Sequence, residues 1–302
     1  MAAPTTASEL LDVEEVNHST LAAYAQQLQS CLQWDPLHGV EGEEKLLFVE
    51  ALTEIAAMPL DSISMEIRRL LQLHLRNLIS ALSARDVQLK CKAANAVGSL
   101  CISRVAGQQL LDLYGDQVLK NVAKMATCKN QWAQGDAFFV LGWMVVIADE
   151  ETLGAIAKLL PTVIKCLHRN NERRDAAARR SREALASSEQ ASNFRVYALV
   201  LLLNFSQRYV DVFEDLLEKV LPMLRDLVYA EILRLAITLL SVLVDQIETA
   251  ASQLLELKML PSLLKLKRVL ETPEVTELVG EAGILDITER LEAAIETLVN
   301  CR

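Results

Sequence analysis

The chain has 302 residues, a formal net charge of −10 and a pI near 5.1, and such an acidic surface disfavours general binding to nucleic-acid phosphates. Its hydrophobic fraction of 52% is ample for a continuous core, whereas only 10 Gly and 7 Pro encode few turns. Because Leu, Ala, Glu and Val are abundant and breakers are scarce, the composition predicts an all-α protein and excludes large sheets.

The N-terminal segment carries no targeting signal that we recognise. Met1 to Val16 contains acids but no Arg or Lys, so it resembles neither a secretory signal nor a mitochondrial presequence. No apolar run in the chain reaches the roughly 18 residues of a membrane span. We therefore expect a disordered tail over residues 1–17, no membrane partner, and a cytoplasmic or nuclear location.

Residues 18–60 predict an N-terminal helical cap made of two helices. These cover Thr20 to Trp34 and Glu43 to Met58, and the Pro and Gly of Asp35 to Gly39 mark the turn between them. Asp61 to Ser64 then offers N-cap side chains for the next long helix.

Leu-Pro pairs recur through the central part of the chain, each followed by a helical apolar stripe. The prolines are Pro161, Pro222 and Pro261, and because proline is tolerated in a first helical turn, each pair predicts a helix start. Pro222 and Pro261 are 39 residues apart, and Pro161 and Pro222 are 61 apart. Similar segments without proline lie at Leu75 to Leu82 and Asp116 to Met125. The steps indicate a period of about 40 residues with one insertion.

A second type of segment, rich in Ala and Leu, alternates with the first. Its four copies are Val87 to Cys101, Trp132 to Val146, Ser192 to Ser206, and Ala230 to Val244. The stretch SARDVQLKCKAANAVGSLC, followed by GQQLLDLYGDQVLKNVAKM, resembles an armadillo repeat. Leu202 to Ser206 is similar to the Ala-Leu-x-Asn-Leu-Ser pattern of that family. The chain therefore resembles the armadillo/HEAT helical-repeat superfamily, with no specific member identified.

This resemblance implies a single-domain, right-handed α-solenoid of about five to six units. The repeats span residues 61–270, and neighbouring units would share one core because none can bury its apolar stripe alone. The alternative is an irregular helical bundle. Residues 271–302 predict a C-terminal helical cap, with a short helix from Thr272-Pro273, a break at Gly280 and Gly283, and a last helix from Asp286 to Cys301.

One basic insertion, residues 169–191, interrupts the repeats. It has almost no large apolar residues and carries six arginines, which are Arg169, Arg173, Arg174, Arg179, Arg180 and Arg182. One interpretation is a solvated loop with an exposed helical stretch over Asp175 to Ala186. The other is a docking arm for an acidic partner, a phosphoprotein or a nucleic acid.

Motifs for catalysis are absent from the sequence. It contains no HExxH, GxSxG, P-loop or GxGxxG pattern and no EF-hand ligand ladder. The four histidines fall in different units, and His74 lies among apolar helical neighbours that predict a packed side chain. The six cysteines have no CxxC spacing and mostly lie on apolar helical faces, which is typical of buried thiols. We expect no catalytic, cofactor-binding or metal site, and hence no enzyme.

Trp143 occupies a position of particular interest, because it aligns with Ser99, Asn204 and Val242 at the place of the family's groove asparagine. In importin-α-like armadillo proteins a ladder of Asn and Trp on the concave face clamps extended basic peptides. Only Asn204 keeps the asparagine here, so the resemblance disfavours a classical nuclear-import adaptor. Trp143 is either a core side chain, which we favour, or a partner anchor.

The sequence thus predicts a non-catalytic protein-binding scaffold or adaptor that uses the concave face of a repeat array. The candidate groove residues are Gln88, Asn95, Ser99, Asp136, Trp143, Arg195, Asn204 and Arg234. The expected partner in the groove is a basic or amphipathic protein segment, and an acidic partner is expected at the arginine-rich insertion. The alternatives are a regulator of a nucleotide-binding enzyme, such as a co-chaperone or exchange factor, and a structural subunit of a cytoskeletal or chromosome-associated complex.

Overall fold

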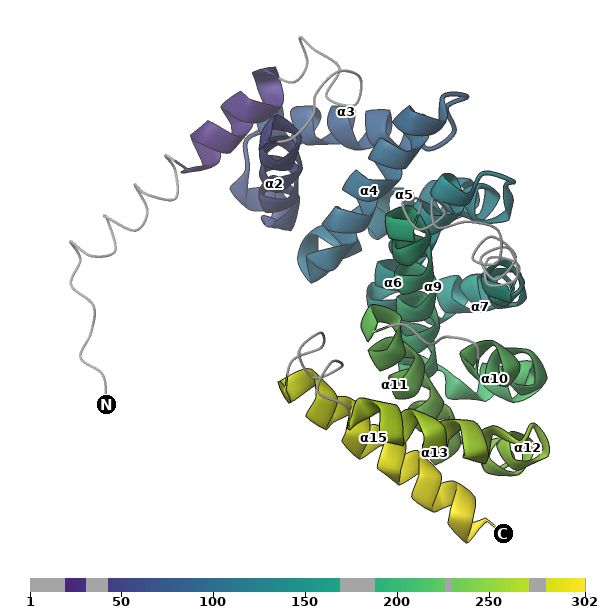
Figure 1. Ribbon diagram of the computed structural model, residues 1–302. Helices are drawn as coiled ribbons and strands as arrows, with labels where there is room; N and C mark the ends of the chain where they lie inside the picture. The colour runs from purple at the N-terminus through teal and green to yellow at the C-terminus, as the bar shows by residue number, and fades with distance from the viewer. Residues whose placement is uncertain (1–19, 31–42, 169–187, 226–229, 272–280, 302) are drawn as a thin grey trace. The chain divides into compact units, whose positions relative to one another are not determined.

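The computed structural model describes residues 20–30, 43–168, 188–225, 230–271 and 281–301 (Figure 1). Helices make up 89% of these residues, and none of them is in a strand, so the all-α prediction is confirmed. The chain divides into two compact units, Met1–Val122 and Ala123–Arg302. The boundary between them falls inside the long helix α5 (Arg104–Thr127).

In the first unit, three helices, α2 (Glu43–Ala57), α3 (Met65–Ala81) and α4 (Val87–Ile102), pack on one another. Its other elements are a helix over 20–30, the 3-10 helix η1 (Leu60–Ser62) and the first part of α5. The Ser64 hydroxyl accepts a hydrogen bond from the Ile67 amide at 3.3 Å, which confirms the predicted cap. His74 is 2% exposed, and its Nε2 lies 2.9 Å from the Leu28 carbonyl, which confirms it as a packed side chain.

The second unit is built on four long helices that lie side by side. In order, α6 (Gln131–Ile147) packs on α9 (Ser188–Arg208), α9 on α11 (Ala230–Gln246), and α11 on α15 (Glu281–Asn300) (Figure 1). Shorter helices connect them: α7 (Glu150–Ala157), a helix over 160–168, η3 (Val210–Leu216), α10 (Leu217–Arg225), α12 (Ala250–Glu256) and α13 (Met259–Leu270). The predicted Ala/Leu-rich segments coincide with α4, α6, α9 and α11.

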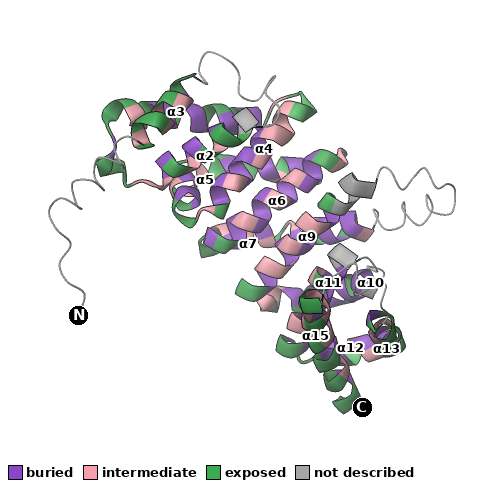
Figure 2. Cartoon of the chain, turned by 60° about the vertical axis from the view of Figure 1, so that its left-hand side comes forward, coloured by how far each residue is buried: buried purple, intermediate pink, exposed green. Residues whose placement is uncertain are grey.

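Two glycines allow α6 and α9 to pack closely. A Cβ added to Gly135 would lie 3.5 Å from the Phe194 Cα, and one added to Gly142 would lie 3.5 Å from the Leu201 Cα. Phe138 fills the space beside them, with its ring centroid 5.3 Å from that of Phe194. Most residues of α6 are accordingly buried (Figure 2). This contact holds the outward faces of α6 and α9 next to each other.

Two predicted helix boundaries are wrong. Pro261 lies in the first turn of α13, as expected, but Pro222 is the sixth residue of α10. The buried Leu217 and Val220 start that helix earlier, directly after η3, and packing outweighs the cost of the internal proline. Gly283 does not break a helix but is the third residue of α15, because a single glycine costs a helix only about 1 kcal/mol and the buried Ile287, Leu291 and Leu298 of the same helix outweigh it.

The basic insertion ends earlier than predicted, because residues 188–191 belong to α9. Residues 169–187, with all six arginines of the insertion, lie outside the described residues, as do the N-terminal tail and the short helix expected at Thr272. Among the described helices, no single one is long and apolar enough to cross a membrane. The bent pair Leu233–Gln246 and Ala250–Glu256 together reaches the length and apolar composition of a span, by those two criteria only.

Candidate protein-binding surface

One face of α6 presents large side chains away from the core. Its residues are Trp132, Asp136, Phe139, Trp143 and Val146, and their spacing of four, three, four and three places them in one line along the helix. Trp132 is 53% exposed and Val146 44%, while the three between them are half-buried. The intervening residues face the core, so this line is the solvent-facing side of α6.

Tyr197 of α9 continues this surface across the helix–helix contact. Its ring centroid lies 4.9 Å from that of Phe139. Burial, followed by the negative charge of Asp136, raises the pKa of Tyr197, so its hydroxyl stays protonated at neutral pH. The Asp136 carboxylate therefore lies close enough to the Tyr197 hydroxyl to act on its ionisation, and Asp136 stands between Trp132 and Phe139 in the line along α6. We define the aromatic surface as Trp132, Asp136, Phe139, Trp143 and Tyr197.

Two polar side chains of α9 donate hydrogen bonds to backbone carbonyls of α6 and of the residue that ends it. The Asn204 Nδ2 donates to the Gly142 carbonyl at 2.9 Å. Arg208 Nη1 donates to the carbonyls of Val145 at 2.7 Å and Ala148 at 2.9 Å. These two carbonyls lie at the C-terminus of α6, where unpaired acceptors and the helix dipole favour a cation. Asn204, a predicted groove residue, thus binds the protein's own backbone, and Arg208 was missed because its acceptors are 60 or more residues away.

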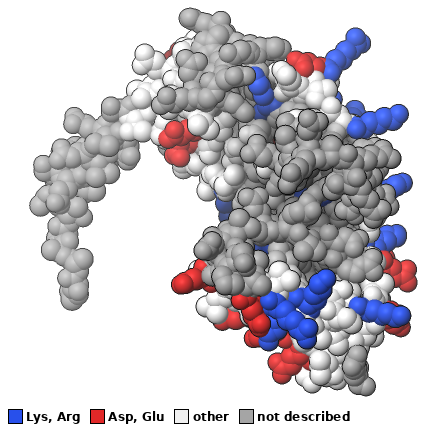
Figure 3. Space-filling model, viewed as in Figure 1, with Lys and Arg blue, Asp and Glu red and all other residues white. Residues whose placement is uncertain are grey.

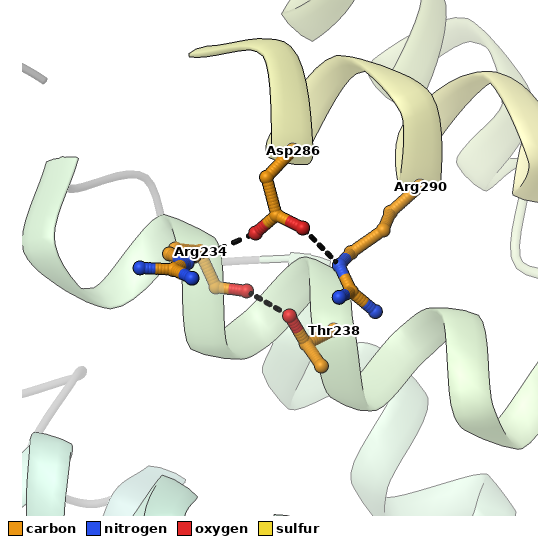
Figure 4. A network of polar contacts seen from close by, with 4 residues as sticks. All are labelled: Arg234, Thr238, Asp286 and Arg290. Carbon is orange, nitrogen blue, oxygen red and sulfur yellow. Dashed lines mark hydrogen bonds and ion pairs between the residues drawn. The ribbon is translucent and has the colours of Figure 1, made fainter. Parts of the chain in front are cut away.

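A second polar cluster joins α11 to α15 (Figure 4). Arg234 Nε donates to one Asp286 carboxylate oxygen at 2.9 Å, and Arg290 Nε donates to the other at 2.9 Å. The hydrogen bond from Arg290, assisted by Arg234, lowers the pKa of Asp286, so this carboxylate stays ionised at neutral pH. The Arg234 side chain remains 63% exposed, as the prediction of a surface residue requires.

The other candidate residues divide between the two units. Gln88, Asn95 and Ser99 lie on one face of α4 in the first unit, where Gln88 is exposed and the other two are half-buried. The Ser99 hydroxyl donates to the Asn95 carbonyl at 2.9 Å. Arg195 is only 2% exposed, so its assignment to an accessible groove is wrong. It precedes the half-buried Val196 and lies on the inner side of α9, where one residue of helical register decides exposure.

Cysteine and metal chemistry add no further site among the described residues. Within them, no three His, Cys, Asp or Glu side chains are grouped so that they could hold a metal ion. Cys101 and Cys166 are buried, and burial raises the pKa of the Cys101 thiol to about 12, which makes it unreactive.

Comparison with known proteins gives the fold but no close relative. No family model matches the chain, and no curated protein matches it. Among solved structures, a designed armadillo repeat protein aligns with a TM-score of 0.56 at 16% identity, covering 91% of this chain and 99% of the other. The chain has an armadillo/HEAT-like repeat fold.

Other structures with the same armadillo/HEAT-like architecture extend this result. A designed armadillo repeat protein in complex with the peptide (KR)4 aligns with a TM-score of 0.53 at 15% identity, covering 91% of this chain and 99% of the other. Importin beta aligns with a TM-score of 0.53 at 14% identity, covering 92% of this chain but only 37% of its own. The predicted resemblance and the predicted α-solenoid are confirmed at the level of the fold.

Proposed function

We propose that this protein is a non-catalytic scaffold that binds a segment of a partner protein on the aromatic surface of α6 and α9. The observation that carries the proposal is the alignment of Trp132, Phe139, Trp143 and Tyr197 on one solvent-facing surface. Aromatic side chains dominate the binding energy of protein interfaces, because they bury a large area at a small cost in conformational entropy.

Asp136 suggests the chemistry of the bound segment. A carboxylate beside the rings of Tyr197 and its α6 neighbours favours a Lys or Arg whose stem lies on the rings and whose charge faces the acid. The expected partner is therefore a basic or amphipathic segment. A protein of the same fold is known in complex with the peptide (KR)4, which supports this choice without identifying the partner. We place the interaction in the cytoplasm or nucleus.

A peptide selection tests the proposal directly. Random 16-residue peptides displayed on phage are selected on the full-length chain, and enriched peptides are measured by fluorescence anisotropy. Trp132→Ala should weaken binding by about 2 kcal/mol, or about thirtyfold, because Trp132 is an exposed aromatic anchor. Trp143→Ala is a poorer probe, since that side chain is half-buried and its loss also lowers stability.

The matched control is Leu264→Ala, which removes an exposed apolar side chain from α13. It should leave peptide affinity within about twofold of the parent chain. Equal losses in the two variants would contradict the assignment of the surface. Binding that appears only with added nucleotide-binding enzyme and depends on its nucleotide would favour the regulator alternative instead.

A further inference from the structure

The arginines that contact Asp286 use only part of their hydrogen-bonding capacity. Arg234 and Arg290 each engage the carboxylate through Nε alone. Each arginine has two further nitrogens, Nη1 and Nη2, which together carry four N–H donors. These donors make no hydrogen bond to any residue that the structure describes. Figure 4 shows the two guanidinium groups, which come from two different helices, on opposite sides of the carboxylate. The side chains of Arg234 and Arg290 are 63% and 40% exposed.

The cluster is locally positive in an acidic protein. Two guanidinium groups face one carboxylate, which leaves a net charge of about +1. In the lower part of Figure 3, where α13 and α15 lie, basic and acidic side chains are interspersed. Asp286 fixes the two arginines in place, so an incoming oxyanion would meet donors that are already oriented.

The position of Arg234 relates this cluster to the aromatic surface. Arg234, Thr238, Ser241 and Asp245 have the same four-three-four spacing as the α6 line, and all four are exposed or half-buried. Arg234 is the fifth residue of the repeat segment Ala230 to Val244, as Asp136 is of the segment Trp132 to Val146. Since α6, α9 and α11 pack in sequence, two helix spacings of about 8–10 Å separate the two positions. An extended chain at about 3.3 Å per residue crosses that distance in about five or six residues.

We propose that Arg234 and Arg290 form an anion subsite that binds an Asp or Glu carboxylate of the partner segment. This acid lies about five or six residues from the side chain held on the aromatic surface. The inference rests on the proposed function and adds a second, oppositely charged determinant at a defined spacing. A plain basic peptide would satisfy the aromatic surface but not this subsite.

The test uses the peptide selection in parallel on three full-length chains. These are the parent, the double variant Arg234→Ala/Arg290→Ala, and the charge-matched control Lys265→Ala/Arg268→Ala on the exposed side of α13. The peptides enriched on the parent and on the control should carry an Asp or Glu about five or six residues from the side chain that binds the aromatic surface. The double variant should retain the anchor and lose the acid. Arg234→Gln, which leaves the Arg290–Asp286 pair intact, repeats the test if the double variant melts at a lower temperature.

Anisotropy on one enriched peptide then measures the coupling. Replacing its acid by Asn or Gln should weaken binding to parent and control about tenfold, and to the double variant less than twofold. The subsite would be refuted if the enriched peptides shared a side chain for the aromatic surface but no acid at that spacing. It would also be refuted if replacing the acid weakened binding equally on all three chains. Either result would leave the proposed function intact. Binding that requires phosphoserine in place of the acid would also overturn the carboxylate assignment. If no peptide is enriched over an unrelated protein, the proposed function fails and the subsite fails with it.

Discussion

Arg208 gives the sharpest test of how the second unit is held together. Its guanidinium donates to the last carbonyls of α6 at 2.7 and 2.9 Å, across a separation of 60 residues or more in sequence. The substitution Arg208→Met keeps most of the apolar stem and removes both bonds. Hydrogen bonds from charged groups contribute about 1.5–3 kcal/mol each, but these carbonyls become accessible to water once the side chain is gone. We therefore expect a loss of about 1–2 kcal/mol in the free energy of unfolding.

Urea denaturation followed by circular dichroism measures this loss. Arg268→Met is the matched control, because Arg268 is an exposed arginine on α13. It should stay within about 0.5 kcal/mol of the parent chain. Arg208→Lys should recover only part of the stability, since an ammonium group cannot reproduce the planar fork. If Arg208→Met and Arg268→Met unfold at the same urea concentration, the hydrogen bonds from Arg208 to the end of α6 contribute nothing to stability and the reasoning is refuted.

Three further predictions concern stability. Burial is the main cause that lowers the pKa of His74, so folding disfavours protonation of this side chain. The His74 contribution to the free energy of unfolding should therefore be full above about pH 6.5 and should fall as the pH drops toward the lowered pKa. Thermal melts of the His74→Gln variant should lack this pH dependence. Gly154→Ala should raise stability by about 0.5–1 kcal/mol, because an added Cβ meets nothing within 4 Å inside α7; an unchanged melting temperature would contradict this. Lys258→Gly should stabilise by about 1 kcal/mol in the same assay, since Lys258 has a φ of 54°.

The sequence predicted the architecture well because the repeat encodes it many times. Each long helix carries its own apolar stripe, so an error in one unit does not change the fold. Boundaries were less secure, because Pro222 and Gly283 are local signals that tertiary burial overrides. Burial of Leu217 starts α10 five residues before Pro222, although a proline normally lies in the first turn of a helix.

The site was harder to predict, because exposure changes completely from one helical position to the next. The sequence named Asp136 as a groove candidate and favoured a core position for Trp143, whereas the structure places both half-buried on the solvent-facing side of α6. Arg195, another groove candidate, is buried. No periodicity links Arg234 to Asp286, which are 52 residues apart in sequence. Contacts of this kind follow from which helices become neighbours, and only the folded chain shows that.

The distribution of polarity along the second unit bears on how such a surface could select a partner. On α6 the outward line is mainly aromatic, whereas on α11 it consists of Arg234, Thr238, Ser241 and Asp245. A uniform row of aromatic and acidic residues would bind basic segments in any register, because each unit would accept the same side chain. A surface whose chemistry changes from one helix to the next binds well in one register only, since a shift by two units places either the partner's acid against Asp136 or its cation against Arg234. Specificity would then come from the sequence of charges along the partner, while the rings supply most of the affinity.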